Sequence, residues 1–207
     1  MNEASVLIKD ARSGRTRRGV WLAGLVVIGC LASDGTGVNP PGEEFDVSQG
    51  AYGWWAAKDV GTTFTDGINA ITVSPQARGP LRLISARPLM DGGGTLRVVG
   101  ILARINPDMM PPKAPGSFQV APGFPPTMPR AAGAVPVEGL IVQAPKQGEV
   151  RWIELQIGYE VVATGRSARR GVELVYDYEG ARHRVVIPSY LAICAPSTVT
   201  CEPEYDT

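Results

Sequence analysis

Thioether sulfurs are the side chains of this sequence that most directly suggest metal chemistry. Three of the five methionines, Met109, Met110 and Met128, lie in a proline-rich stretch, residues 106–134, and Met90 lies in an earlier turn. Soft sulfur ligands bind Cu(I), so a copper site is one hypothesis. The spacing lacks the methionine-x-methionine or histidine-methionine rhythm of such sites. We therefore prefer the interpretation that these methionines pack the proline-rich loop against the fold.

Aromatic residues cluster in the stretch GAYGWWAAKD, at Tyr52, Trp54 and Trp55. Exposed rings there could stack on the sugars of a cell-wall glycan or rest at a membrane interface. Adjacent residues of an extended chain point to opposite faces, so the pattern predicts one tryptophan inside and one outside. Packing is the preferred interpretation, and ligand binding by the three aromatic residues is the alternative.

Catalytic constellations are poorly represented. The single histidine excludes an HExxH zinc site, and the sequence contains no GxSxG elbow and no Walker A loop. A Ser–His–Asp triad could form only around His183, which alternates with apolar residues and is predicted to be a solvated strand residue. No cofactor motif is present. We therefore expect a protein that is not an enzyme.

The opening of the chain has the layout of a targeting segment. Arg17 and Arg18 precede an uncharged run, residues 19–33, of 15 residues. A helix needs roughly 20 apolar residues to cross a bilayer, so this run favours a signal peptide over a permanent span. The basic flank places the rest of the chain outside the cytoplasm. The arginine pair also fits a twin-arginine export signal as an alternative to the general export route.

The run ends in VVIGC, residues 26–30, which resembles the lipobox of bacterial lipoproteins. In composition and layout the chain is similar to small lipoproteins of actinobacterial type. The resemblance implies cleavage before Cys30 and a diacylglycerol on its thiol, although Ile28 is bulkier than the usual residue at that place. A signal anchor and ordinary secretion remain the alternatives. The predicted location is the outer face of the cell membrane.

Lipidation of Cys30 would leave Cys194 and Cys201 to pair with each other. An odd cysteine count is awkward in an oxidising compartment, and this assignment resolves it. The intervening residues include Pro196 and Ser197, which favour a turn. A structural disulfide is therefore predicted, in preference to a metal or redox pair.

The charge pattern argues against nucleic-acid binding. Residues 1–30 carry five basic and two acidic residues, which leaves 15 basic and 18 acidic residues in the remainder. A mild acidic excess does not attract a phosphate backbone.

The remaining sequence predicts an all-β fold. Residues 31–50 are rich in turn formers and are predicted to be a flexible tether, followed by a single domain over residues 51–207. Strand patterns cover residues 62–73 with an Asp-Gly turn inside, a hairpin over 80–105 around the turn 91–94, and residues 137–143 and 149–164. In the first strand of the hairpin, alternation places Leu81, Leu83 and Ser85 on one face. In residues 149–164, alternation separates two faces: Ile153, Leu155, Ile157 and Tyr159 on one, and Trp152, Glu154, Gln156 and Gly158 on the other. After a loop at 165–171, two strands over 172–195 flank a turn at Glu179 and Gly180. We predict an antiparallel β-sandwich, immunoglobulin-like in the broad sense.

These observations suggest a non-enzymatic module of the bacterial cell envelope, held at the membrane by a lipid or an N-terminal helix. A protein-binding or assembly role is the first hypothesis. A module that binds copper or a cell-wall glycan is the alternative.

Overall fold

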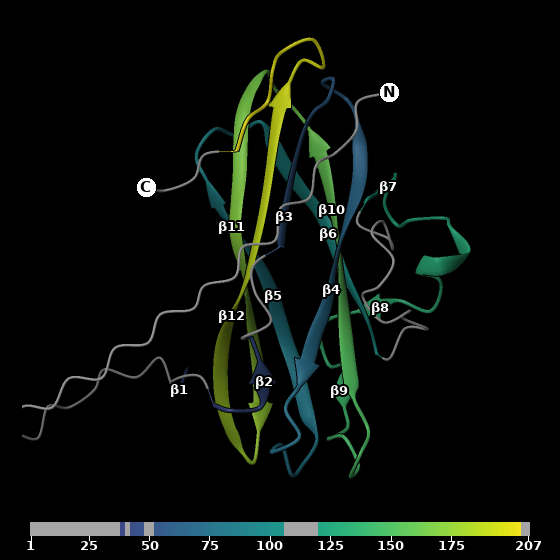
Figure 1. The fold of residues 1–207 in the computed structure, drawn as a ribbon, viewed down its shortest axis with the longest axis vertical. Helices are drawn as coiled ribbons and strands as arrows, with labels where there is room; N and C mark the ends of the chain where they lie inside the picture. Colours follow the sequence, from purple (N-terminus) through teal and green to yellow (C-terminus); the bar gives the residue numbers. More distant parts are fainter. Residues whose placement is uncertain (1–37, 40–41, 48–51, 106–119, 204–207) are drawn as a thin grey trace, which may run out of the picture.

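Two β-sheets packed face to face make up the protein, with their strands along the long axis of the molecule (Figure 1). The structure, a computed structural model, describes residues 38–39, 42–47, 52–105 and 120–203. Strands dominate this part of the chain, and its one helical element is the 3-10 turn η1 (Pro129–Ala131). The predicted all-β sandwich is therefore confirmed.

The first sheet, sheet A, has six strands. Its central strands are β12 (Ala181–Ala195), β11 (Gly165–Tyr178) and β5 (Leu81–Asp91), which pair antiparallel in that order. The short strand β9 (Ile141–Val142) pairs with the start of β5. On the other edge, β1 (Val38–Asn39) and β3 (Tyr52–Ala57) both run parallel to β12.

The second sheet, sheet B, also has six strands. Its centre is β4 (Thr63–Val73), β10 (Arg151–Val161) and β6 (Leu96–Ile105), paired antiparallel with β10 in the middle. Three short strands line the edges: β2 (Phe45–Asp46) and β7 (Val120–Pro122) on β4, and β8 (Val135–Pro136) on β6. In Figure 1, β7, β8 and the chain between them lie at the right of the molecule.

The predicted turn between β11 and β12 is confirmed. Glu179 and Gly180 connect these strands with φ values of 49° and 79°. Positive φ at both central residues is the geometry of a two-residue type I′ turn, whose twist matches that of the flanking strands. Glycine adopts this conformation without strain, which explains its position here.

The core lies between the sheets and follows the period-2 pattern of the long strands. In β10, Ile153, Leu155, Ile157 and Tyr159 all point into it, as the alternation predicted. Leu81 and Leu83 of β5 do the same, whereas Ser85 is exposed. A register shift between Leu83 and Ser85 reverses the alternation, so that Ala86 faces the core in its place.

The predicted hairpin over residues 80–105 is wrong. Its two strands exist as β5 and β6, but β5 belongs to sheet A and β6 to sheet B. Residues 91–94 form the connection between the two sheets. All three glycines of this connection have positive φ, and a chain that leaves one layer for the other needs such unusual backbone geometry.

The predicted Asp-Gly turn inside residues 62–73 is also wrong, since β4 continues through Asp66 and Gly67. The irregularity of this strand lies further on, where Ile68 and Ile71 of β4 pair with Leu155 and Ile153 of β10. Asp66 stays in the strand because partners inside the core satisfy its carboxylate, as described below.

Residues 165–171, predicted as a loop, form the first half of β11. Their polar sequence hid the strand, because Arg169 points into the core and is fully buried. A register shift lies between Arg169 and Gly171, and there the alternation of core-facing and outward-facing side chains in β11 moves by one residue.

The folded part begins earlier than the sequence indicated. The tether was predicted over residues 31–50, but β1 pairs with sheet A and β2 with sheet B inside that range. Phe45 of β2 is a core residue and meets the ring of Tyr176 edge to face, at 4.9 Å between centroids. Residues 38–39 and 42–47 thus contribute strands to both sheets.

Candidate functional site

A buried ion pair connects the two sheets through the core. Arg169 of β11 donates from Nη1 to the Asp66 carboxylate of β4, and both side chains are fully buried. The same Arg169 nitrogen donates to Tyr159 Oη at 3.2 Å, and Trp54 Nε1 of β3 donates to Asp66 Oδ1 at 2.8 Å. Two residues of each sheet therefore share one polar network. A buried charge requires such partners, and the network fixes how the sheets face each other.

Tyr159 makes this network sensitive to alkaline pH. Burial raises the pKa of Tyr159 from its ordinary value to about 12, because the phenolate would have to form inside the core. The folded state thus holds this proton more tightly than the unfolded chain. The stability linked to Tyr159 is complete below pH 10 and is lost as the pH rises from about 10 to about 12.

We therefore expect the urea midpoint to fall over that pH window, and to fall less steeply in Tyr159→Phe than in the parent. The slope of the midpoint against pH is the measurement. Equal slopes in the two proteins would contradict this account of Tyr159.

The second polar network lies on the outer face of sheet B. Glu154 of β10 is fully buried and accepts two hydrogen bonds from Arg104 of β6, at 2.9 Å from Nε and 2.9 Å from Nη2. Gln156, also fully buried, donates to Glu154 Oε1 at 2.7 Å and to the carbonyl of Ala131 at 3.3 Å. Carboxylates on the outer face of a sheet are normally solvated, so a covering element must lie above them.

That element is the described part of the proline-rich stretch, residues 120–134, which we call the covering segment. It begins in β7, paired with β4, and is followed directly by β8, paired with β6. Between these edges it crosses β10, where Ala131 binds Gln156 and the Ala132 carbonyl accepts from Arg104 Nη1 at 3.5 Å. The segment therefore spans sheet B from one edge to the other.

An aromatic ring fastens the covering segment at a second place. Gly158 of β10 and Gly100 of β6 are register partners, and a Cβ built on either glycine would overlap the ring of Phe124. Because neither glycine has a side chain, the two leave a flat surface on the outer face of sheet B on which this ring packs. We call Gly100 and Gly158 the glycine bed of Phe124. Nearby, Thr65 Oγ1 donates to the carbonyl of Gly123 at 2.5 Å.

One side of the covering segment packs on sheet B, and the other side faces solvent. Three of its four prolines and its one threonine are exposed, whereas Pro126 is partly buried. Ala121 and Ala131 are buried, with Met128 packed against them. The exposed prolines are Pro122, Pro125 and Pro129, and the exposed threonine is Thr127. The covering segment thus presents a proline-rich surface from a fixed backbone.

The predicted aromatic cluster divides between the two faces of sheet A. Trp54 is buried in the core, whereas Trp55 is partly exposed, so the inside–outside prediction is confirmed. Tyr52 lies at the start of β3. The predicted ligand set of Tyr52, Trp54 and Trp55 is therefore not a single exposed surface, since Trp54 binds Asp66 inside the core.

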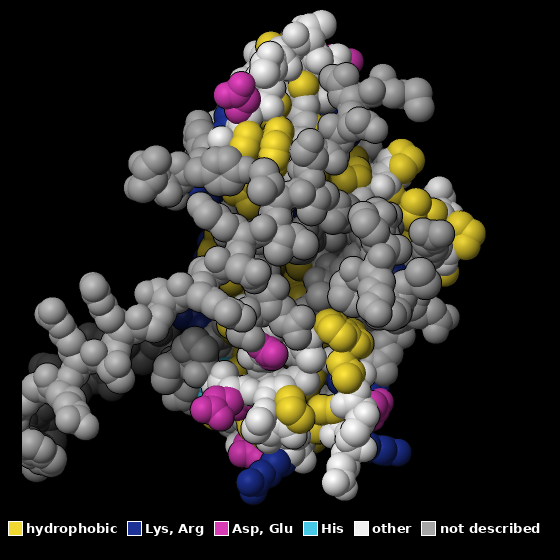
Figure 2. Space-filling view, viewed as in Figure 1, with side chains coloured by type: hydrophobic (Ala, Val, Ile, Leu, Met, Phe, Trp, Pro, Cys, Tyr) yellow, Lys and Arg dark blue, Asp and Glu magenta, His cyan; other side chains and the backbone are white. Residues whose placement is uncertain are grey.

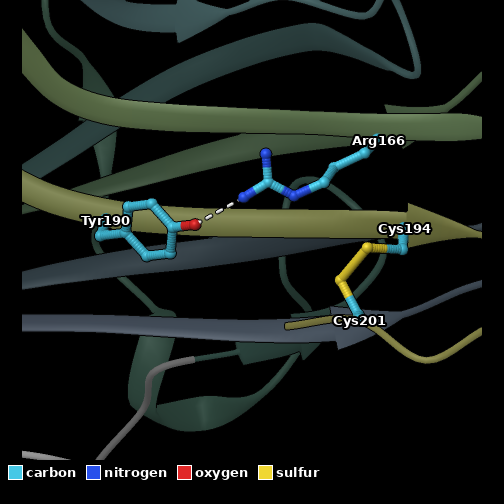
Figure 3. Close-up of a disulfide and its surroundings, with 4 residues drawn as sticks. All are labelled: Arg166, Tyr190, Cys194 and Cys201. Carbon is cyan, nitrogen blue, oxygen red and sulfur yellow. Dashed lines mark hydrogen bonds between the residues drawn. A yellow bond between two sulfur atoms is a disulfide. The ribbon is translucent and has the colours of Figure 1, made fainter. Parts of the chain in front are cut away.

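Trp55 has neighbours that the sequence did not connect with it. Its register partner on β12 is Ala192, and Tyr190 pairs with Gly53, so Trp55 and Tyr190 share the outer face of sheet A. Arg166 of β11 reaches over this face and donates from Nη2 to Tyr190 Oη at 2.8 Å (Figure 3).

The disulfide between Cys194 and Cys201 lies beside Arg166 and Tyr190 (Figure 3). Its Cα atoms are 5.5 Å apart and its sequence separation is 7, so the predicted pairing is confirmed. The bond ties the chain that follows β12 back to the end of that strand. Nearby, the backbone N–H of Ser197 donates to Asp59 Oδ1 at 2.9 Å.

Removal of this disulfide by the double substitution Cys194→Ser and Cys201→Ser is expected to lower the free energy of unfolding. Closing so short a loop contributes about 2–3 kcal/mol in the chain-entropy account. Urea unfolding of the variant, beside the parent with and without reductant, measures the loss. A parent whose stability does not respond to reductant would contradict the prediction.

The other predicted site residues are placed as follows. Cys30, Met109 and Met110 lie outside the described residues, as does the whole predicted signal segment. Within the described ranges, no helix is long and apolar enough to cross a membrane. Across the same ranges, no group of three or more His, Cys, Asp or Glu side chains is arranged to hold a metal ion. His183 stacks on Tyr176 with the ring centroids 5.6 Å apart.

The chain matches no known protein family and no curated protein. The class of protein is therefore defined by the fold alone. It is a β-sandwich with a disulfide at the end of β12 and with a proline-rich segment fixed across one sheet. Arg104, Glu154, Gln156 and Phe124 are site residues that no sequence motif indicated. The one available signal was the pair Glu154 and Gln156 within a strand whose other face is apolar, and it does not reveal what covers them.

Proposed function

We propose that this chain is a membrane-tethered, extracytoplasmic β-sandwich that acts as a non-enzymatic binding module for another protein of the cell envelope. The observation that carries the proposal is the covering segment, held at both edges and at the centre of sheet B while three of its four prolines stay exposed. The membrane tether and the location rest on the targeting segment and on the resemblance of residues 26–30 to a lipobox.

A fixed proline-rich surface favours recognition of a protein. Proline side chains lose little conformational entropy on binding, and a preorganised backbone avoids the cost of ordering a loop. Proline-rich segments are recurrent ligands of aromatic-lined grooves on partner proteins. Residues 122–129 combine both properties, since Phe124 holds the backbone on its glycine bed and the neighbouring prolines face solvent.

The polar groups near the covering segment support a structural role for this network. The Glu154 carboxylate is occupied by two hydrogen bonds from Arg104 and one from Gln156. A general acid or base needs access to a substrate proton, and this carboxylate lies under the covering segment. We therefore propose that Glu154 serves to position the segment.

The alternative function is a small-ligand module, and one observation favours it. Trp55 and Tyr190 lie on one outer face with the Arg166 guanidinium beside them, and this combination suits stacking on a sugar ring. Copper binding through Met109, Met110 and Met128 is the other form of this alternative. Isothermal titration with Cu(I) and with soluble cell-wall fragments tests both forms, and heat in the micromolar range would favour this function over protein binding.

A photo-crosslinking amino acid at Thr127, in the full chain made by the producing bacterium, tests the proposal. We expect one defined protein adduct from Thr127 and none from the same probe at Thr198, an exposed residue in the disulfide loop. Gly158→Ala, which displaces Phe124 from its bed, should reduce the Thr127 adduct. Equal adducts from the two positions, or no adduct from Thr127, would overturn the proposal.

A further inference from the structure

Arginine side chains gather on the outer face of sheet A at the end where β11 turns into β12. Two register rows carry three of them: Arg82 of β5, Asp177 of β11 and Arg182 of β12 form one row, and Arg87 is the partner of Glu173 in the other. Arg184 of β12 reaches the same Glu173. We call Arg82, Arg87, Arg182 and Arg184 the arginine face.

The two carboxylates of the arginine face are less exposed to solvent than the guanidinium groups with which they pair. Glu173 lies between Arg87, 3.1 Å from its Oε1, and Arg184, 3.8 Å from its Oε2. The Glu173 side chain is 19% exposed, whereas those of Arg87 and Arg184 are 66% and 62% exposed. The carboxylate therefore holds both arginines while their outer N–H groups face solvent.

The arginine face has a local positive charge in a chain of zero net charge. Its four guanidinium groups outnumber the carboxylates of Glu173 and Asp177, and the difference leaves a charge of +2. A hydrogen bond from Arg182 lowers the pKa of Asp177, so that carboxylate remains charged. Glu179 in the hairpin turn and Arg78, whose N–H binds Tyr178 Oη, add one charge of each sign at this end.

The N-terminal part of the chain enters the fold beside this face. Val38 and Asn39 of β1 pair with Arg182 and His183 at the start of β12. Figure 1 shows β1 near the lower end of the molecule, and charged side chains of both signs gather at that end in Figure 2. Val38 follows Cys30 after seven intervening residues, and a fully extended chain over these eight steps reaches at most roughly 30 Å. A lipid on Cys30 would therefore keep the arginine face close to the bilayer.

We propose that the arginine face docks on the anionic phospholipid headgroups of the membrane to which the N-terminus is attached. This inference rests on the tether in the proposed function. Guanidinium groups bind phosphate oxygens through paired N–H donors, and arginines that Glu173 already orients lose less conformational entropy on binding. Each net positive charge near an anionic surface strengthens binding about fivefold, so the local charge of +2 favours the docked orientation of a tethered domain about 30-fold. Such docking directs sheet B and its covering segment away from the bilayer.

The test uses the native full chain reconstituted in vesicles of phosphatidylcholine, with or without phosphatidylglycerol, that carry a quencher on the headgroups. A fluorescent amino acid replaces Val186, an exposed residue opposite Glu173 on β12, or Val99, an exposed residue of β6 in sheet B. We expect quenching at position 186 only, and only in vesicles that contain phosphatidylglycerol. High salt should weaken it.

Matched variants separate the arginine face from charge in general. The double substitution Arg87→Gln and Arg184→Gln should lower the ratio of docked to undocked domains about 30-fold. Arg97→Gln, which removes an arginine of sheet B that is 64% exposed and paired with Glu160, should leave the ratio unchanged. Circular dichroism of each variant verifies the fold.

Two results would overturn the inference in distinguishable ways. If the chain floats with the vesicles but position 186 is not quenched, or is quenched no more than position 99, the docking is wrong and the tether stands. If the native chain does not float with any vesicle, the tether fails, and the docking fails with it.

Discussion

Replacement of Asp66 by alanine is expected to lower the free energy of unfolding by about 3–5 kcal/mol, the largest effect of any single substitution that we predict. The change leaves the Arg169 guanidinium in the core without its carboxylate and removes the acceptor of Trp54 Nε1. A buried charge that loses its counterion cannot regain solvent without opening the sandwich. Urea or thermal unfolding measures the loss.

Two controls isolate this effect. Asp177→Ala removes a carboxylate that is also paired with an arginine, Arg182, but on the solvated surface, and it should cost much less. The combined change Asp66→Leu and Arg169→Met removes both charges together and should recover much of the stability lost in Asp66→Ala. If Asp66→Ala unfolds at the same urea concentration as the parent, the network is not what joins the two sheets.

Glu154→Ala is expected to release the covering segment and to lower the free energy of unfolding by about 2–4 kcal/mol. The substitution leaves Arg104 without its bidentate partner and takes one acceptor from Gln156. Since these side chains also hold the carbonyls of Ala131 and Ala132, we expect faster hydrogen exchange at the amides of Ala131 and Ala132.

The matched control is Glu160→Ala on the same strand. Its carboxylate pairs with Arg97 at 2.5 Å, but this pair is solvated, since 64% of the Arg97 side chain and 29% of the Glu160 side chain are exposed. Exchange over residues 120–134 should therefore stay at the parent's rate in Glu160→Ala. Unchanged exchange in Glu154→Ala as well would show that the network does not hold the segment.

Local sequence signals predicted the features of the fold that depend on neighbouring residues. The alternation over Ile153, Leu155, Ile157 and Tyr159 identified the central strand of sheet B, and Glu179 and Gly180 identified the β11–β12 turn. The short separation of Cys194 and Cys201 likewise made their pairing predictable. Each of these features is decided by residues within one strand or one turn.

Features that depend on contacts between distant residues were not predictable. Arg169 and Asp66 are 103 residues apart, and each alone favours a loop or a turn, so only their pairing explains the strands that contain them. Residues 91–94 look the same whether they close a hairpin or connect two sheets. The arginine face has the same origin, because the sequence shows only a balanced net charge while the register of three strands brings Arg82, Arg87, Arg182 and Arg184 together.

The candidate site was hidden for a further reason. Alternation predicted that Glu154 and Gln156 lie on the face opposite the core, but it contains no information on what crosses that face. Phe124 and its bed of Gly100 and Gly158 come from three separate segments. The proline-rich stretch was predicted as a surface loop, and its described part is instead an ordered cover with strands at both ends.

The intact mass of the native protein, extracted from membranes before and after reduction and alkylation, tests the central claim most directly. We predict a chain that begins at Cys30 with the added mass of a diacylglycerol, and two thiols that become alkylated only after reduction. A full-length chain with unmodified Cys30 would replace the lipid by a signal anchor. A chain cleaved after Cys30 and recovered from the aqueous fraction would contradict a membrane-tethered binding module.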